Sequence, residues 1–396
     1  LLAGEIGVRW TYRCPSCGAE YPIEPGRYLC DPCGSRNAPG KPLEGVLECR
    51  FELEAREGGE WLETGRIPLP VEGRHFPSIP VGDTPLWAPL RLRSELGFPG
   101  LWLKDDTCEP SGSYKDRASY LVAAFALEHR INEIALASTG NAASSMACVG
   151  AAAGIRVTVF LPRSAPVAKR VQVLQYGAEL REIDGTYDLA FDECMAYTER
   201  TGVLSRNTAY NPLTIEGKKT AAFEIVRALR RSLSPMPDHV FVPTGDGVIV
   251  AGVIKGFEDL IALGEIDRMP RIWAVQAEGS SAIARALASG RIEPRPSTTI
   301  ADSISVDAPR NGPFALAKLR AHSGSAVVAS DEEILEAQLL GSSRAGLFAE
   351  PSSACALAGF LKARSEIRAG ETAVVMLTGS GLKDVKGAAR AVGATI

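Results

Sequence analysis

From residue 100 onward, short apolar segments typical of β-strands alternate with longer segments of helical periodicity. This order favours strand–helix–strand units, which form an α/β fold with a largely parallel sheet covered by helices. In such folds ligands bind beyond the carboxyl ends of the strands, where the next helices begin. Functional residues are therefore expected at the strand-to-helix junctions. The predicted strands are 100–104, 133–137, 157–161, 179–183, 240–243, 271–276 and 372–377, and the predicted helices are 118–130, 142–153, 168–176, 187–201, 216–231, 247–263, 332–344 and 352–364.

The size and charge of the chain limit the class of protein. At about 150 residues per domain, a chain of 396 residues predicts two or three domains. Apolar residues at 45% and charged residues at 23% are typical of globular proteins and exclude a disordered chain. The 43 basic and 47 acidic side chains leave a formal charge of −4. This near balance argues against nucleic acid or an anionic membrane as a partner.

One uncharged stretch, residues 134–155, is long enough to raise the question of a membrane span. It is dominated by Ala, Ser and Gly and leads into the predicted buried strand at 157–161, so we predict no membrane segment. The first residues, Leu1 to Glu5, lack a basic start followed by an apolar run, which predicts no secretory signal. We therefore expect a cytoplasmic protein.

Four of the nine cysteines follow the pattern C-x2-C-x12-C-x2-C, with a glycine after each pair. A tight turn in each pair directs two thiolates at one ion, and four sulfur ligands in a closed tetrahedral site favour structural zinc. The alternative is four ordinary or disulfide-bonded cysteines, which a cytoplasmic location disfavours. We predict a zinc-ribbon segment over residues 1–45, in which the metal serves folding and not catalysis. The predicted ligands are Cys14, Cys17, Cys30 and Cys33, whereas Cys49, Cys108, Cys148, Cys194 and Cys355 are predicted to be buried small hydrophobic residues.

The first notable junction, residues 110–117, places Lys115 in the first turn of a predicted helix. The helix dipole disfavours an ammonium group at this end of a helix. A destabilised ammonium favours the neutral amine that Schiff-base chemistry requires. By itself, a lysine beside a Gly-Ser turn is more often a solvated surface residue.

Three further junctions combine a predicted strand with a glycine-containing turn. The turn at 138–141 offers backbone N–H groups and hydroxyls that can bind a carboxylate, with simple helix capping as the alternative. The turn at 245–249 can hold a phosphate, although it lacks the Walker lysine and the dinucleotide-binding glycine spacing. The strand at 372–377 is followed by a hydroxyl residue, Thr378, and two glycines. Each of these signals is weak on its own.

Together, these junctions resemble the fold-type II pyridoxal-phosphate enzymes, and the threonine synthases in particular. The resemblance extends over about residues 80 to 390. A zinc-ribbon-like N-terminal segment is also familiar in threonine-synthase-like proteins. The segments that carry the resemblance are GDTPL at 82–86, SYKDR at 113–117, STGN at 138–141, EGKKT at 216–220, EPSSA at 350–354 and LTGSGLKD at 377–384.

The resemblance implies a role for each junction. Lys115 would form the Schiff base with pyridoxal phosphate and act as the main acid and base. Asn141 would hydrogen-bond the phenolic oxygen of the cofactor. Thr378 would face its pyridine nitrogen, which leaves the ring unprotonated and suits elimination and replacement better than transamination. The remaining implied contacts are Gly245, Asp246, Gly247, Val248 and Ile249 to the cofactor phosphate, and Ser138, Thr139 and Gly140 to the substrate carboxylate.

The resemblance also implies an architecture and an activity. It implies two open, largely parallel α/β domains of the tryptophan synthase β-like kind, with the cofactor between them. The large domain would comprise 46–117 and 216–396, and the small domain 118–215. A homodimer is usual in this fold type. The implied reaction is that of a threonine synthase, which converts O-phospho-L-homoserine and water to L-threonine and phosphate by γ-elimination and β-addition.

Three positions depart from the threonine synthase pattern. Thr214 stands where an arginine is expected to serve the phosphate of the substrate, and Ala142 stands where threonine is common. Asp246 stands where asparagine is usual, and a carboxylate beside a phosphate is repulsive unless it points away or accepts backbone N–H bonds. The candidate replacements for the missing cation are Arg206, Lys218 and Arg310.

Two alternatives therefore stay open. The first is a related pyridoxal-phosphate lyase, either a threonine or serine ammonia-lyase or a β-replacement enzyme. Such an enzyme acts on an amino acid without a γ-phosphate and needs no site for one. The second alternative, from a different class, is a zinc-ribbon binding module attached to a degenerate enzyme body.

Overall fold

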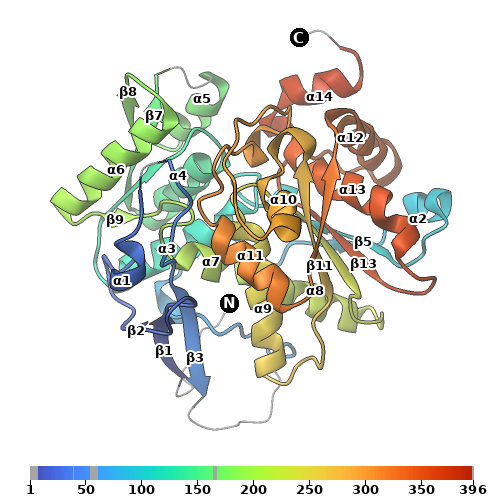
Figure 1. The fold of residues 1–396 in the computed structure, drawn as a ribbon, viewed down its shortest axis with the longest axis horizontal. Coiled ribbons are helices and arrows are strands. Elements are labelled where there is room, and N and C mark those ends of the chain that lie inside the picture. Colours follow the sequence, from blue (N-terminus) through green and yellow to red (C-terminus); the bar gives the residue numbers. More distant parts are fainter. Residues whose placement is uncertain (1–7, 39, 54–60, 164–166, 395–396) are drawn as a thin grey trace. The chain divides into compact units, whose positions relative to one another are not determined.

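The computed structural model describes residues 8–38, 40–53, 61–163 and 167–394 (Figure 1). The predicted absence of a secretory signal concerns Leu1 to Glu5 and lies outside the described residues. The chain forms two compact units, one of residues 1–82 and 115–220 and the other of residues 83–114 and 221–396. Their assignment as the small and large domains of an enzyme stays a prediction.

The first unit begins with a small antiparallel sheet in the strand order β2-β1-β3. The first strand pairs with the third from Val8 opposite Leu53 to Arg13 opposite Glu48. The predicted metal-ligating cysteines lie between these strands, beside the short helix α1. The bounds are β1 Val8–Arg13, β2 Glu20–Tyr21, α1 Asp31–Gly34 and β3 Glu48–Leu53.

The same unit contains a parallel four-stranded sheet in the order β8-β7-β6-β9. On one face, alternate residues of β6 and β7 such as Ala137 and Phe160 pack against Phe191 of α6. On the other face α4 approaches closely, because a Cβ on Gly150 would lie 2.4 Å from Val157. The bounds are α3 Lys115–Glu128, β6 Glu133–Ala137, α4 Asn141–Ala153, β7 Arg156–Pro162, α5 Val167–Gln175, β8 Glu179–Ile183, α6 Tyr187–Thr201, β9 Leu204–Ser205 and α7 Leu213–Glu216.

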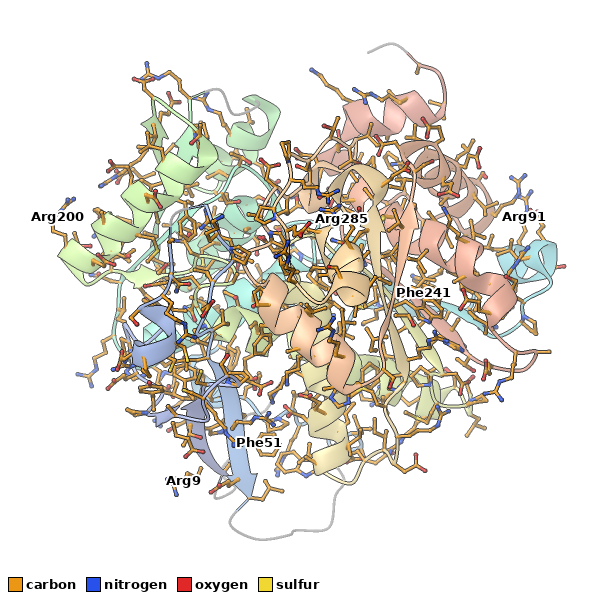
Figure 2. The ribbon with its side chains drawn as sticks, viewed as in Figure 1. Arg9, Phe51, Arg91, Arg200, Phe241 and Arg285 are labelled. Carbon is orange, nitrogen blue, oxygen red and sulfur yellow. The ribbon has the colours of Figure 1, made fainter. Side chains whose placement is uncertain are left out.

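The second unit contains a six-stranded sheet in the order β12-β11-β10-β13-β5-β4. All neighbouring strands run parallel except β4, which pairs antiparallel with β5. Figure 2 labels Phe241 in the core of this sheet, where its ring stacks on Trp273 with centroids 5.3 Å apart. The core continues into α13, where a Cβ on Gly359 would lie 2.5 Å from Val275.

The helices of this unit connect its strands. The bounds are β4 Leu86–Trp87, α2 Leu90–Leu96, β5 Leu101–Asp105, α8 Thr220–Arg231, β10 His239–Pro243, α9 Val248–Ala262, β11 Arg271–Ala277, α10 Ala282–Ser289, α11 Gly312–Ala321, β12 Ser325–Ala329, α12 Asp331–Ala345, α13 Pro351–Ala363, β13 Ala373–Leu377 and α14 Val385–Ala391. No helix among the described residues is long and apolar enough to cross a membrane.

The cysteines outside the ribbon correct one prediction. Cys49, Cys148, Cys194 and Cys355 are buried as expected, but Cys108 is exposed. Its position in a single turn of 3-10 helix, Asp106–Cys108, directs it away from the sheet core. Desolvation of the thiol and the carboxylates of Asp105 and Asp106 raise the pKa of Cys108 to about 11, so the group is protonated at neutral pH.

Candidate active site

Lys115 is the first residue of α3 and is half-buried. The residue before it, Tyr114, donates its backbone N–H to the carbonyl oxygen of Thr378 at 2.9 Å. Ser113 forms an antiparallel bridge with Gly379. The segment that leads into Lys115 is therefore held by backbone hydrogen bonds to the turn after β13, which is the turn that carries the sequence-predicted Thr378.

A buried arginine holds the first turn of α3 from within the first unit. Arg206 is fully buried, and its guanidinium donates to the carbonyl oxygen of Lys115 at 3.4 Å and to Ser119 Oγ at 3.1 Å. It also donates to Thr208 Oγ1 at 2.6 Å. A buried guanidinium needs such acceptors, and here they fix the backbone of the candidate lysine. Arg206 thus contacts the backbone of Lys115.

The β6–α4 turn carries four predicted site residues. Ser138 donates its N–H to Phe160 O at 3.1 Å, and its hydroxyl accepts the N–H of Gly140 at 3.2 Å. Gly140 is the N-cap residue of α4, and a glycine has no side chain with which to cap the helix. Open space surrounds the position that a Cβ on Gly140 would occupy. The turn therefore presents the N-terminus of a 13-residue helix to a region that can hold an anionic group. Its other predicted residues are the half-buried Thr139 and the buried Asn141.

The two helices that start at Lys115 and Asn141 are linked to each other. Ser145 of α4 donates its hydroxyl to Ser119 Oγ of α3 at 2.7 Å, and both side chains are buried. Upstream, the N–H of Ala137 donates to Asn207 Oδ1 at 2.7 Å. The first unit thus brings together Lys115 and the 138–141 turn on a connected frame of buried hydrogen bonds.

The β10–α9 turn of the second unit has different properties. Thr244 anchors its start by donating its N–H to Val275 O at 2.8 Å. Gly247 is the N-cap residue of the 15-residue helix α9 and has φ of 89°, in the left-handed region that favours glycine. A Cβ on Gly247 would lie 2.6 Å from the Cβ of Ala315, and a Cβ on Gly245 would lie 2.9 Å from the Cα of Ile304. The turn is closely packed by its own unit and leaves backbone N–H groups at the start of α9 available to a ligand.

The carboxylate of Asp246 in this turn has a hydrogen-bond donor. Its Oδ1 accepts the backbone N–H of Arg310 at 3.1 Å. A carboxylate beside a phosphate is repulsive unless it points away or accepts backbone N–H bonds. The Asp246 carboxylate accepts such a bond and is therefore compatible with a nearby anion. The contact ties the segment before α11 to the turn.

Thr378 follows β13 directly and is buried. Its N–H donates to Ser353 Oγ at 2.7 Å, and Glu350 donates its own N–H to Gly379 O at 2.9 Å. The start of α13 therefore holds this turn, and the segments 350–354 and 377–384 that carry the sequence resemblance lie side by side.

Thr214 uses its hydroxyl locally. Its Oγ1 donates to Asn211 O at 2.7 Å, and Lys218 Nζ donates to the carbonyl oxygen of Thr214 at 2.8 Å. Both side chains are fully buried. Of the three candidate replacement cations, Arg206 and Lys218 belong to the first unit and Arg310 to the second.

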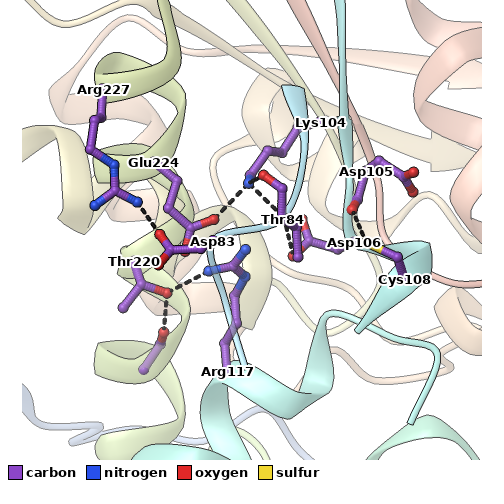
Figure 3. A network of polar contacts seen from close by, with 11 residues as sticks. Asp83, Thr84, Lys104, Asp105, Asp106, Cys108, Arg117, Thr220, Glu224 and Arg227 are labelled. Carbon is purple, nitrogen blue, oxygen red and sulfur yellow. Dashed lines mark hydrogen bonds and ion pairs between the residues drawn. The ribbon is translucent and has the colours of Figure 1, made fainter. Parts of the chain in front are cut away.

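Sequence reasoning missed a buried ion pair in the second unit (Figure 3). Lys104 Nζ lies 2.6 Å from Glu224 Oε2 and also donates to the carbonyl oxygen of Thr84 at 2.6 Å. A second ion pair joins Arg227 to Asp83. These contacts connect residues 83–84 of the GDTPL segment to β5 and α8. The signal in the sequence was a lysine inside a predicted buried strand, since such a charge must find a partner.

The four clustered cysteines fit a metal better than a disulfide framework. Their sulfur atoms all lie within 4.8 Å of one another, and none is disulfide-bonded. Tetrahedral zinc with Zn–S bonds of about 2.3 Å requires sulfur atoms about 3.8 Å apart. Burial raises the pKa of Cys30, but hydrogen bonds from Tyr21 and the backbone outweigh it and lower the pKa to about 7. The donor set is compatible with a zinc ribbon.

Comparison with known proteins agrees with this fold. Residues 78–379 match the family model described as pyridoxal-phosphate dependent enzyme. The chain therefore belongs to the pyridoxal-phosphate-dependent enzyme family, and the predicted fold class is confirmed.

Within that family the chain is similar to threonine synthases. It is 33% identical to the threonine synthase of Methanocaldococcus jannaschii, an alignment that covers 96% of this chain and 94% of the relative. It is 35% identical to that of Synechocystis sp., over 82% of this chain and 83% of the relative. Among solved structures, it resembles a threonine deaminase from T.th. with 28% identity and a TM-score of 0.67, over 76% of this chain and 92% of that one.

The β10–α9 turn fits the phosphate of the family's cofactor. A phosphate dianion binds well where backbone N–H groups and a helix N-terminus converge. Gly247 supplies the left-handed conformation that exposes those N–H groups, and the packing around Gly245 and Gly247 leaves no space there for a side chain. The geometry therefore fits the assigned family.

Proposed function

We propose that this chain is a threonine synthase, which converts O-phospho-L-homoserine and water to L-threonine and phosphate. The observation that carries the proposal is the extent of the similarity. The alignment to the M. jannaschii threonine synthase covers 96% of this chain and therefore extends beyond the family model, which matches residues 78–379. The threonine deaminase structure covers 76% of the chain at lower identity.

The proposed roles are those that the family resemblance implies for each junction. Gly245 to Ile249 would bind the cofactor phosphate through backbone N–H groups. Asn141 would donate to the phenolic oxygen of the ring, and Thr378 would meet its nitrogen with a neutral hydroxyl. Ser138, Thr139 and Gly140 would orient the substrate carboxylate at the start of α4. When bound, pyridoxal phosphate acts as an electron sink for the substrate's Cα.

Lys115 would move the protons. It would take the proton from Cα of the substrate, release it to solvent, and then take one from Cβ, which allows phosphate to leave from Cγ. A proton would then return to Cγ, water would add its OH at Cβ and give up a proton, and a proton would return to Cα. The contact of Arg206 with the carbonyl oxygen of Lys115 would keep the amine at one position during these transfers. Either Arg206, Lys218 or Arg310 would serve the substrate phosphate in place of the arginine that Thr214 replaces.

The test is product formation by the cofactor-loaded protein given O-phospho-L-homoserine. We expect threonine and phosphate in equal amounts, with a loss of at least about 1,000-fold in Lys115→Ala. Lys41→Ala, an exposed lysine of the same unit, is the matched control and should keep full activity. Cofactor binding without either product would contradict the proposal.

A second candidate is a threonine or serine ammonia-lyase or a β-replacement enzyme. Two observations favour it: the similarity to a threonine deaminase structure, and Thr214, whose hydroxyl is engaged by Asn211 O. Release of ammonia from unphosphorylated threonine or serine by the wild-type protein, absent in Lys115→Ala, would support this candidate. The absence of any turnover of amino acids with intact cofactor binding would instead favour a binding module.

We also infer that the Cys14, Cys17, Cys30 and Cys33 cluster holds structural zinc. The mutual distances of the sulfur atoms support this inference. Metal analysis should find one zinc per chain, and Cys33→Ser should lose it, whereas Cys49→Ser, at a buried cysteine outside the cluster, should retain it. A homodimer is expected from the family resemblance and a cytoplasmic location from the sequence analysis, and light scattering and cell fractionation test them.

A further inference from the structure

Asn311 is a buried amide without a protein partner in the described part of the chain. Its residue is 0% exposed, and neither its Nδ2 nor its Oδ1 makes a hydrogen bond there. Leaving both ends of a buried amide unpaired is costly, typically about 1–3 kcal/mol for each group. Native structures rarely keep such a group unless a ligand or an ordered water completes it.

The side chain of Asn311 does not cap the helix that this residue precedes. Asn311 is the N-cap residue of α11, Gly312–Ala321, where asparagine usually accepts an N–H of the first helical turn. Here the side chain makes no capping bond, although the backbone carbonyl accepts the N–H of Ala315 at 2.9 Å. The first turn of the helix therefore uses only the backbone of Asn311, and the side-chain amide remains available to another partner.

The place of Asn311 identifies the partner. The backbone carbonyl oxygen of Asn311 lies 3.3 Å from the position that a Cβ on Gly247 would occupy, so this residue borders the β10–α9 turn. The preceding residue, Arg310, donates its N–H to Asp246 of that turn at 3.1 Å. Asp246 thus fixes the backbone one residue before Asn311. Both residues belong to the second unit, so this arrangement does not depend on the first unit.

We propose that the amide of Asn311 is a phosphate ligand, which donates to the cofactor phosphate held by the β10–α9 turn, with Asp246 as its positioning residue. The proposal rests on the proposed role of Gly245 to Ile249. It gives Asp246 a function: its carboxylate is turned to the Arg310 N–H and holds a neutral donor at the turn. A neutral donor adds a hydrogen bond without adding charge beside the carboxylate.

The experiment compares binding of pyridoxal phosphate and of pyridoxal, which lacks the phosphate, to the cofactor-free protein. Asn311→Leu keeps the shape and removes both polar atoms, so we expect about tenfold weaker binding of pyridoxal phosphate and unchanged binding of pyridoxal. Asn311→Asp, which is nearly isosteric, should weaken pyridoxal phosphate further by repulsion. The phosphorus-31 resonance of the bound cofactor should shift in both variants.

Variants of Asp246 and Gln338 distinguish an effect on the position of the Asn311 amide from a general effect on core packing. Asp246→Ala should reproduce part of the Asn311→Leu loss, and Asp246→Asn should restore it, because an asparagine Oδ1 still accepts the Arg310 N–H. Gln338→Met removes another buried amide of the same unit, whose Nε2 donates to Ala349 O, and serves as the control for packing. It should leave the preference for pyridoxal phosphate over pyridoxal unchanged.

The outcomes distinguish an error in the proposed phosphate-binding role of residues 245–249 from an error in the role of Asn311 alone. If the wild-type protein binds both compounds equally, the turn is not a phosphate site and the proposed role of 245–249 fails. If the wild-type preference persists in both Asn311 variants, only the inference about Asn311 fails, as it would if a buried water completes the amide. A raised KM for O-phospho-L-homoserine at unchanged cofactor affinity would assign Asn311 to the substrate phosphate and overturn the proposal.

Discussion

Two strand-to-helix turns of this protein are built from similar sequence and behave differently in the structure. The β6–α4 turn, 138–140, and the β10–α9 turn, 244–247, each join a buried parallel strand to a helix that begins without a side-chain cap on a glycine. Around Gly140 there is open space, and its φ is −139°. Gly247 has φ of 89° and lies against Ala315. We therefore propose that the first turn binds its ligands through side chains as well as backbone, and that the second binds through backbone N–H groups.

This difference indicates which turn can tolerate an added side chain. A turn whose backbone conformation and packing are both restricted binds through N–H groups at fixed positions, which suits the invariant phosphate of a cofactor. A turn with free space can accommodate groups that differ between substrates. The first prediction concerns the restricted turn, where we expect the largest effect.

Gly247→Ala should reduce the affinity for pyridoxal phosphate by about 100-fold. It should also lower the free energy of unfolding by about 2–5 kcal/mol, because the left-handed conformation disfavours a side chain and the new Cβ would clash with Ala315. Cofactor titration and denaturant unfolding measure both. Gly290→Ala is the matched control, because Gly290 has φ of 95° but a Cβ there would lie 3.8 Å from a flexible Arg320. It should cost about 1–2 kcal/mol and leave cofactor affinity intact. Equal effects of the two variants would show that strain alone matters.

Gly245→Ala should have a smaller effect in the same turn. The added Cβ would lie 2.9 Å from the Cα of Ile304, which must shift. We expect about 1–3 kcal/mol of destabilisation and about tenfold weaker cofactor binding. In Gly341→Ala, at a helical position where the nearest side-chain atom is 3.4 Å away, both quantities should stay close to wild type. Full cofactor affinity in Gly245→Ala would contradict a restricted turn.

Asn141→Ala tests the other turn through its side chain. Removal of one hydrogen bond to the cofactor ring should weaken binding by about tenfold, change the absorbance of the bound cofactor, and leave protein stability within about 1 kcal/mol. Asn132→Ala, at an exposed asparagine of the same unit, is the control and should change neither. An unchanged absorbance spectrum in Asn141→Ala would remove this residue from the cofactor site.

Gly140→Ala should have the smallest effect on the fold. Nothing lies within 4 Å of the new Cβ, so the free energy of unfolding and the cofactor affinity should stay at the wild-type values. The KM for the amino-acid substrate should rise a few-fold, because the methyl group enters the space proposed for the substrate carboxylate. A large loss of stability would mean that the two turns are restricted alike.

Much of the fold was predictable because its strongest elements are long and periodic. The strands from 100–104 to 372–377 and the helices between them match the observed elements, since a parallel strand buried on both faces is recognisable as an apolar run. Among the elements that were not predicted are helices α2, α10, α11 and α14 and strand β12. Strand β12 lies at the edge of the sheet and is only partly buried. Residues 290–311, between α10 and α11, are rich in Arg, Pro and Ser and carry no periodic signal. That unpredicted region contains Asn311.

The candidate site was predictable to a similar degree. The sequence placed Lys115 at a helix start and the three further turns at strand ends, because local patterns of strand, glycine and helix define such positions. The Asp246–Arg310 contact, the Arg206–Lys115 contact and the Lys104–Glu224 pair join residues 64, 91 and 120 positions apart. No local pattern carries information of that range.

The sequence by itself therefore determined the α/β class, the cysteine cluster and the family, since each depends on patterns within a few tens of residues. Only the tertiary structure decided that Gly247 is closely packed while Gly140 is open, and that the carboxylate of Asp246 faces a backbone N–H. The physical reason is that close packing and buried hydrogen bonds depend on which distant segments meet, and in this chain those segments are brought together by the order of the strands in the sheet.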